Sequence, residues 1–80
     1  MKSEMVQGLK YTVNVNGKTY LIFTKTEDKV TSFYIQREGY GIIRFMIGLD
    51  LDEYDLGCTE EKFINEFIDE WVEEYDEEVY

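Results

Sequence analysis

Residues 11–24 read YTVNVNGKTYLIFT, and this stretch decides the fold class. In residues 11–15 a Tyr and two Val alternate with Thr and Asn, which is the period-two pattern of a strand with one buried face. Asn16-Gly17 tolerates the positive φ angles of a type I′ turn. Residues 18–24 are rich in β-branched and aromatic side chains and return as a second strand. The stretch therefore predicts an antiparallel β-hairpin.

Two further strands are predicted after this hairpin, with short turns between them. Glu27-Asp28-Lys29 is typical of a turn, and the β-branched and aromatic run 30–36 follows it. Glu38-Gly39 indicates another tight turn before the apolar run 42–47. Because connections this short join antiparallel neighbours, the sequence predicts a four-stranded antiparallel meander.

An amphipathic acidic helix is predicted after the sheet. Thr59 is a favourable N-cap, and Glu60 and Glu61 lie in the first turn, where the helix dipole favours negative charge. Apolar residues then recur at steps of three and four and form one face, and acidic residues occupy the rest. The apolar face consists of Phe63, Ile64, Phe67, Ile68, Trp71, Val72 and Tyr75. We expect this stripe to pack against the sheet, with Trp71 largely buried.

The predicted architecture is ββββα, in the α+β class, within one small acidic domain that spans residues 1–80. The chain has no Pro, no repeat and no Gly/Ser-rich linker that would divide it. We expect a weakly structured N-terminus at 1–9, a β-meander at 10–48, an acidic loop at 49–58, a helix at 59–76 and an acidic tail at 77–80.

The composition favours a folded protein that lacks the side chains of most enzymes. With 44% hydrophobic and 16% aromatic residues the chain is too apolar to be disordered. It has no histidine, and Cys58 is its single cysteine, which excludes an internal disulfide and a thiolate zinc site and removes the commonest general base. We expect no enzymatic activity and no cofactor. Because the sequence shows neither a membrane-length apolar run nor a secretory h-region, we expect a cytoplasmic protein.

Negative charge is concentrated in the C-terminal part of the chain. The formal net charge is −10; residues 1–49 hold seven basic and four acidic side chains, whereas residues 50–80 hold fourteen acidic ones and Lys62. Such a surface repels nucleic acid and anionic membranes and attracts a cationic protein. We therefore expect a cationic, nucleic-acid-binding protein as partner. The alternative is that the acidic surface only confers solubility.

The first acidic cluster is residues 50–55, which read DLDEYD. Together with Glu61 it places carboxylates at positions 1, 3 and 12 of an EF-hand-like loop, but position 6 is Asp55 where that loop requires Gly. We therefore interpret the cluster as a solvated acidic loop. A glycosidase pair is also disfavoured, because an exposed acidic helix on so small a domain provides no walled cleft.

The second acidic cluster is residues 73–80, which read EEYDEEVY. Carboxylates at a helix C-terminus oppose the dipole and repel one another, so the arrangement costs stability that an arginine-bearing partner would restore. Carboxylates along a rigid helix can stand in for DNA phosphates, and interspersed Tyr side chains add amphipathic contact area. The pattern favours DNA mimicry as a hypothesis.

The same helix resembles a known family. Residues 61–64 (EKFI), Phe67, Trp71 and residues 74–78 (EYDEE) are similar in type and spacing to the C-terminal helical region of phage-encoded type II-A anti-CRISPR proteins, which inhibit Cas9 by mimicking DNA. Residues 11–13 (YTV) resemble the start of the family's sheet more loosely. The family has three strands with a helix in front of them, whereas this sequence predicts four strands.

The resemblance implies an inhibitor that occupies the cleft of guide-RNA-loaded Cas9 where the protospacer-adjacent motif (PAM) binds, and that thereby blocks target DNA. That cleft reads guanines through paired arginines, for which carboxylates are good acceptors. By position in the resemblance the PAM-site mimics would be Asp76, Glu77 and Glu78, with Glu38 as a secondary contact. From charge alone we add Asp69, Glu70, Glu73, Asp50, Asp52, Glu53 and Asp55. The expected location becomes the cytoplasm of a bacterial host cell.

Two other function classes stay open. One is an acidic immunity protein or antitoxin that neutralises a cationic nuclease, and the other is an acidic accessory subunit without an inhibitory role. Neighbouring genes discriminate among them, because phage genes in a host that carries Cas9 favour the inhibitor and an adjacent toxin gene favours the antitoxin.

Overall fold

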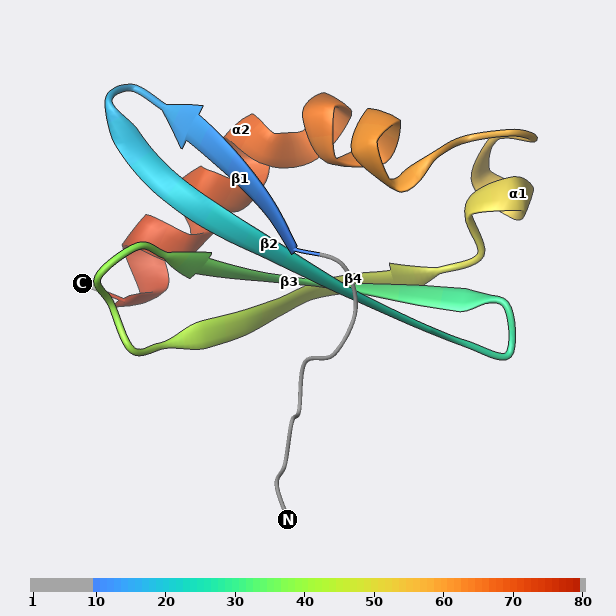
Figure 1. Cartoon of the computed structure of the whole chain (residues 1–80), viewed down its shortest axis with the longest axis horizontal. Coiled ribbons are helices and arrows are strands. Elements are labelled where there is room, and N and C mark those ends of the chain that lie inside the picture. The colour runs from blue at the N-terminus through green and yellow to red at the C-terminus, as the bar shows by residue number, and fades with distance from the viewer. Residues whose placement is uncertain (1–9, 80) are drawn as a thin grey trace, which may run out of the picture.

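A four-stranded antiparallel sheet followed by two helices makes up residues 10–79, which are the residues that the computed structural model describes (Figure 1). The elements are β1 (Lys10–Val15), β2 (Lys18–Glu27), β3 (Val30–Arg37), β4 (Ile43–Leu49), α1 (Leu51–Tyr54) and α2 (Glu60–Val79). The strands lie side by side in chain order, so the predicted meander and its C-terminal helix are confirmed. The expectations for residues 1–9 and for Tyr80 lie outside the described residues.

The first two turns are tight and both use left-handed backbone. Asn16 and Gly17 have φ angles of 55° and 80°, as the predicted type I′ turn requires. The second turn is shorter than the predicted Glu27-Asp28-Lys29, because Glu27 still pairs with β3 and only Asp28 and Lys29 form the turn. Their φ angles of 54° and 69° belong to the region that favours glycine, so this turn holds strained backbone.

The last strand, β4, begins one residue later and ends two residues later than the predicted run 42–47. Gly48 does not stop it, because a Cβ there would lie 3.3 Å from the hydroxyl of Ser32, and glycine lets the pairing continue. A β-bulge interrupts the register between Phe33 and Tyr34, which leaves Met46 as the extra residue on β4. Hydropathy alternation alone does not reveal such an insertion.

The stretch 49–58 is not entirely a loop as predicted, since α1 lies within it. Asp50 caps α1 by accepting a hydrogen bond from the amide nitrogen of Asp52 at 3.0 Å. Thr59 caps α2 as predicted, because its Oγ1 accepts from the amide nitrogen of Lys62 at 3.1 Å.

The predicted end of the helix at residue 76, with a separate tail at 77–80, is also wrong, because α2 continues to Val79. Two contacts hold the C-terminal part of this helix against β4 and the residue before it. The hydroxyl of Tyr75 donates to the backbone oxygen of Ile42 at 2.7 Å, and Glu78 forms an ion pair with Arg44 of β4. Tertiary contacts therefore outweigh the unfavourable charge at the end of this helix.

The hydrophobic core lies between α2 and one face of the sheet. Tyr20 and Ile22 of β2 and Phe33 and Ile35 of β3 are fully buried, and on α2 the side chains of the predicted stripe face them. Trp71 is 7% exposed, and its ring centroid lies 5.4 Å from that of Phe33, so its predicted burial is confirmed. No helix among the described residues is long and apolar enough to cross a membrane.

The first turn of α2 is tied to the sheet by a hydrogen-bonded carboxylate. The hydroxyls of Tyr11 on β1 and Thr24 on β2 donate to the same oxygen of Glu60, at 3.0 and 3.1 Å. Burial of the Tyr11 side chain, this hydrogen bond and the negative charges of Glu60 and Glu61 raise the pKa of Tyr11 to about 12.

Replacing Trp71 with Ala is expected to lower the free energy of unfolding by about 3–5 kcal/mol, because it removes the central ring of the helix–sheet contact and leaves a cavity. Chemical denaturation followed by circular dichroism measures this change. Leu56→Ala is the control, since Leu56 is 87% exposed and its truncation is expected to change stability by less than about 0.5 kcal/mol. Equal midpoints for the Trp71 variant and the unchanged protein would contradict the core assignment.

The hydrogen bond of Tyr11 is expected to make stability depend on pH in the alkaline range. The pKa of Tyr11 lies at its ordinary value of 10.0 in the unfolded chain and is raised to about 12 in the fold. The folded state therefore holds this proton more tightly, and the resulting stabilisation is complete below pH 10 and lost as the pH rises toward 12. The difference between the tyrosinate absorbance titrations of the unchanged protein and of Tyr11→Phe is expected to show one late proton. Loss of that proton at the ordinary pKa would contradict the contact.

Candidate acidic interaction surface

The carboxylates predicted to contact a partner lie in two groups at opposite ends of the molecule (Figure 1). The turns at residues 16–17 and 38–39 lie at one end together with the C-terminal half of α2, and we call this the C-terminal end. At the other end are α1 and the turn at residues 28–29, which we call the α1 end. Because a 20-residue helix is about 30 Å long, the two groups do not form one compact contact surface.

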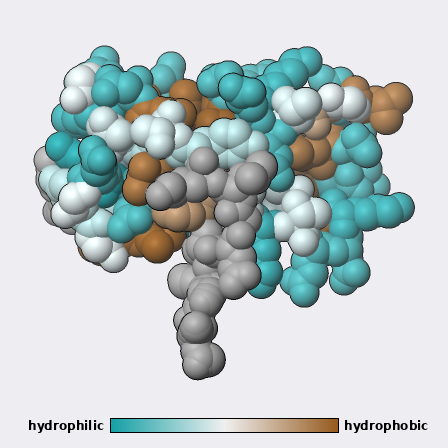
Figure 2. All heavy atoms as spheres, viewed as in Figure 1, coloured by the Kyte–Doolittle hydropathy of each residue, from teal (hydrophilic) through white to brown (hydrophobic). Residues whose placement is uncertain are grey.

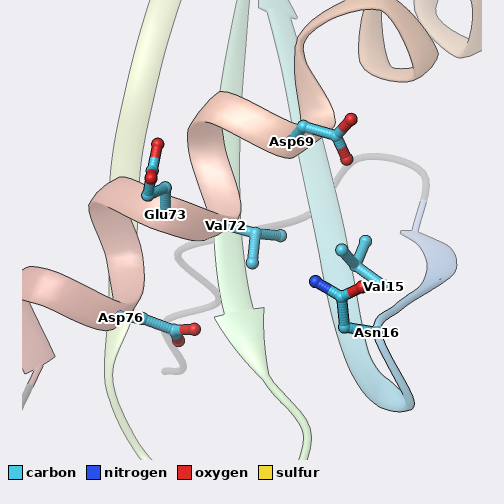
Figure 3. A pocket seen from close by; sticks show the side chains of 6 residues that line it. All are labelled: Val15, Asn16, Asp69, Val72, Glu73 and Asp76. Carbon is cyan, nitrogen blue, oxygen red and sulfur yellow. The ribbon is translucent and has the colours of Figure 1, made fainter.

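An acidic groove lies at the C-terminal end between α2 and the β1–β2 turn. It has a volume of about 400 Å³ and is lined by Val15, Asn16, Asp69, Val72, Glu73 and Asp76. Figure 3 shows Asp69, Val72 and Asp76 on the side of α2 that faces the β1–β2 turn, with Glu73 directed away from that turn. Carboxylates beside an apolar floor suit an arginine, because its aliphatic stem packs on apolar surface while the guanidinium binds the carboxylates.

Asp76 is anchored in this groove by a buried tyrosine. The hydroxyl of Tyr20 lies 3.1 Å from each of the two carboxylate oxygens of Asp76. Tyr20 is 0% exposed and packs edge-on against Tyr75, with ring centroids 6.2 Å apart, so its hydroxyl has a fixed position. Since a carboxylate has about four acceptor positions, Asp76 keeps acceptors for a partner while its orientation is set by the core.

Glu78 already has an arginine partner within the chain. Its Oε1 lies 2.7 Å from Nη2 of Arg44, and the two side chains are 53% and 39% exposed. A pair this exposed contributes at most about 1 kcal/mol, so a partner's arginine can compete for it. Glu78 therefore faces β4, whereas Asp76 faces the β1–β2 turn.

Glu77 points to neither side of the sheet but into solvent. Consecutive helical residues are rotated by about 100°, so Asp76, Glu77 and Glu78 do not form the single cluster that their adjacency suggests. Glu77 instead shares a face of α2 with Glu70 and Glu74, at the spacing that brings helical side chains together. All three are exposed, and none has a hydrogen-bond or ion-pair partner among the described residues. We call these three residues the acidic ridge.

Glu38 lies at the same end of the molecule, on the turn between β3 and β4. The turn is closed by a hydrogen bond from the amide of Tyr40 to the backbone oxygen of Arg37 at 2.9 Å, and Gly39 has a φ angle of 89°. The guanidinium of Arg37 lies 4.6 Å from the ring centroid of Tyr40. Glu38 is exposed beside this cation, so the negative field is weaker here than along α2.

The carboxylates at the α1 end mainly serve the local fold. Asp50 caps α1, Asp52 accepts a hydrogen bond from the amide of Gly57 at 3.4 Å, and Asp55 lies 3.6 Å from the ammonium of Lys62. Glu53 is exposed in the same short helix. Within residues 10–79 no three His, Cys, Asp or Glu side chains are grouped as a metal site. Cys58 is 8% exposed, and its thiol donates to the backbone oxygen of Thr59 at 3.4 Å.

Sequence reasoning missed three residues that shape the surface, namely Asn16, Tyr20 and Arg44. Asn16 was interpreted only as a turn residue, although it also lines the acidic groove. Tyr20 follows the strand alternation, and nothing in that pattern indicates a bond to Asp76. Arg44 gives the clearest signal, because it is a charged residue within the apolar run 42–47.

Comparisons of the chain with protein-family models, curated proteins and solved structures give no match. Arguments about function therefore rest on the residues of the chain itself and on the geometry of its acidic surface.

Proposed function

We propose that the chain inhibits guide-RNA-loaded Cas9 as an acidic mimic of DNA, and that it blocks target DNA by occupying the PAM-binding cleft. The proposed site of action is the cytoplasm of a bacterial host. The observation that carries this proposal is the charge on the C-terminal half of α2, where the acidic groove and the acidic ridge lie side by side on one rigid helix.

The charge density of this segment is close to that of DNA. Residues 69–78 contain seven carboxylates. Ten helical residues rise about 15 Å, which gives one negative charge per about 2 Å of axis. Double-stranded DNA carries one per about 1.7 Å. A protein surface adapted to phosphates therefore meets a comparable field along this helix.

The fixed position of Asp76 supports binding to arginines that read bases. Such arginines donate two parallel hydrogen bonds, and a carboxylate accepts both. Because Tyr20 holds the carboxylate of Asp76 in place, less side-chain freedom is lost when a partner binds. The proposed mechanism is occupancy of the cleft, with no chemical step.

The competing function is an immunity protein or antitoxin that neutralises another cationic nuclease. The same helix would serve it, since charge alone does not distinguish among cationic clefts. The resemblance of residues 61–78 to the anti-CRISPR family favours Cas9 as the target over another nuclease.

Binding to Cas9 with and without guide RNA is the experiment that tests the proposal. We expect binding to guide-loaded Cas9 to weaken as ionic strength rises, because exposed charges are screened, and an excess of PAM-containing duplex to displace the chain. Duplex without a PAM is the matched control and is expected to compete poorly. Simultaneous binding of the chain and PAM duplex would contradict cleft occupancy, and binding to an unrelated cationic nuclease alone would favour the antitoxin.

Single carboxylate substitutions test whether specific residues or only the total charge bind the partner. Asp76→Asn and Glu77→Gln are each expected to weaken binding by about 2–5 kcal/mol where the carboxylate contacts the partner. Most of this loss is expected as faster dissociation. Glu77→Gln is expected to leave folding unchanged or slightly more stable, because it removes a negative charge near the helix C-terminus.

Glu27→Gln and Glu61→Gln are the matched controls for these variants. Each removes one charge from an exposed side chain remote from the C-terminal end, so each is expected to slow association slightly and to leave dissociation unchanged. Rate constants for all four variants at one ionic strength decide the question. Equal losses in all four would show that only electrostatic steering acts.

A further inference from the structure

The sheet face opposite α2 carries an apolar surface that no described element covers. Alternation along β2 and β3 places Leu21, Phe23 and Tyr34 on this face, because their neighbours in sequence are buried in the core. The strand register places Ile43 and Phe45 of β4 on the same face. Phe45 is 55% exposed and Ile43 is 37% exposed. On the face that Figure 2 views, hydrophobic atoms reach the surface between hydrophilic ones. We call these five residues the open-face patch.

The strand register makes the patch continuous. Phe23 pairs with Tyr34, and Tyr34 pairs with Phe45, so three rings form one row across β2, β3 and β4. The rings of Tyr34 and Phe45 are in edge contact, with centroids 5.5 Å apart. In the next row Leu21 and Ile43 flank Gln36. Directly opposed residues of an antiparallel pair share a face, so both rows lie on the same surface.

Gly48 extends the patch toward the β2–β3 turn. A Cβ at Gly48 would lie 3.5 Å from the ring of Phe45 and 3.7 Å from Val30, which is 42% exposed. Because Gly48 has no side chain, the ring of Phe45 and the side chain of Val30 both lie close to this position and extend the apolar surface.

The charge of the two faces differs. Within β2, β3 and β4 the two rows contain no charged side chain. Lys10 of β1 pairs with Phe23 at the end of the first row, and Lys25 lies on the same face by alternation, whereas the carboxylates of the acidic groove and the acidic ridge all lie on α2. An apolar face flanked by lysines does not attract a cationic partner, and its apolar centre matches a second surface of the same kind.

We propose that the open-face patch is a homodimer interface, in which two copies pack sheet against sheet with α2 on the outside. The molecule measures 34 × 34 × 19 Å, so a broad face has room for the ~800 Å² that a standard interface takes from each partner, with the open-face patch as its apolar part. Closed two-fold dimers are the commonest oligomers, and a face of this kind packs on its own copy at about 10 Å, as in a β-sandwich.

Repulsion between two copies favours this orientation, because each chain has a net charge of −10. Contact through α2 would bring two acidic helices together. Sheet-to-sheet packing separates them by two helix–sheet layers and one sheet–sheet layer, about 30 Å in all, whereas the Debye length in 0.15 M salt is about 8 Å. The repulsion is then screened, and both acidic surfaces stay free. This inference does not depend on the function proposed above.

Sedimentation equilibrium over a concentration series tests the dimer. We expect the mass to approach twice 9.6 kDa, and the association to be unchanged or strengthened by added salt, opposite to binding through the acidic helix. Phe45→Glu is expected to weaken association at least tenfold. Because Phe45 is exposed, the circular dichroism spectrum of the variant is expected to stay unchanged.

Leu56→Glu is the matched control, because it adds the same charge at an exposed apolar residue of the α1–α2 connection and is expected to leave the dimer intact. A monomer at every concentration would overturn the proposal and leave the patch to residues 1–9 or to another protein. A dimer that resists Phe45→Glu would overturn it as well, since the interface would then lie elsewhere.

Discussion

The contact of Trp71 and Phe63 with Phe33 is the interaction on which the rest of the structure depends. The remainder of α2 is so acidic that its own charges oppose a helix, with each like-charged pair one turn apart costing about 0.2–0.5 kcal/mol. One buried aromatic side chain contributes several times that amount. The free energy of packing therefore exceeds the repulsion between the carboxylates. Because packing fixes which side of α2 is buried, it also fixes which carboxylates are exposed.

Hydrogen bonds from the sheet fix the position of one carboxylate near each end of α2. At the start of the helix Glu60 accepts from Tyr11 and Thr24. Toward its end Tyr20 positions Asp76. The acidic groove and the acidic ridge therefore belong to one rigid body, in contrast to a solvated tail whose carboxylates change position freely. This preorganisation lowers the ordering cost of binding.

The sequence predicted what local patterns determine and missed what depends on contacts between distant residues. The Asn16-Gly17 turn and the stripe around Trp71 follow from backbone preference and periodicity, and both are present as predicted. The bulge at Met46 and the extension of α2 to Val79 depend on partners across the sheet, so no local pattern indicated them. The carboxylates at residues 76–78 were named from the resemblance, across the predicted end of the helix. In the structure all three lie within α2, where helical rotation directs them to three sides.

A cryo-electron-microscopy structure of the chain with guide-loaded Cas9 tests the central claim most directly, namely that the C-terminal half of α2 replaces DNA. We expect the acidic groove and the acidic ridge to face the arginines that read the PAM, with residues 50–55 and the open-face patch outside the contact. A complex in which the PAM cleft is empty, or in which the chain binds through α1 or through the open face of the sheet, would contradict it.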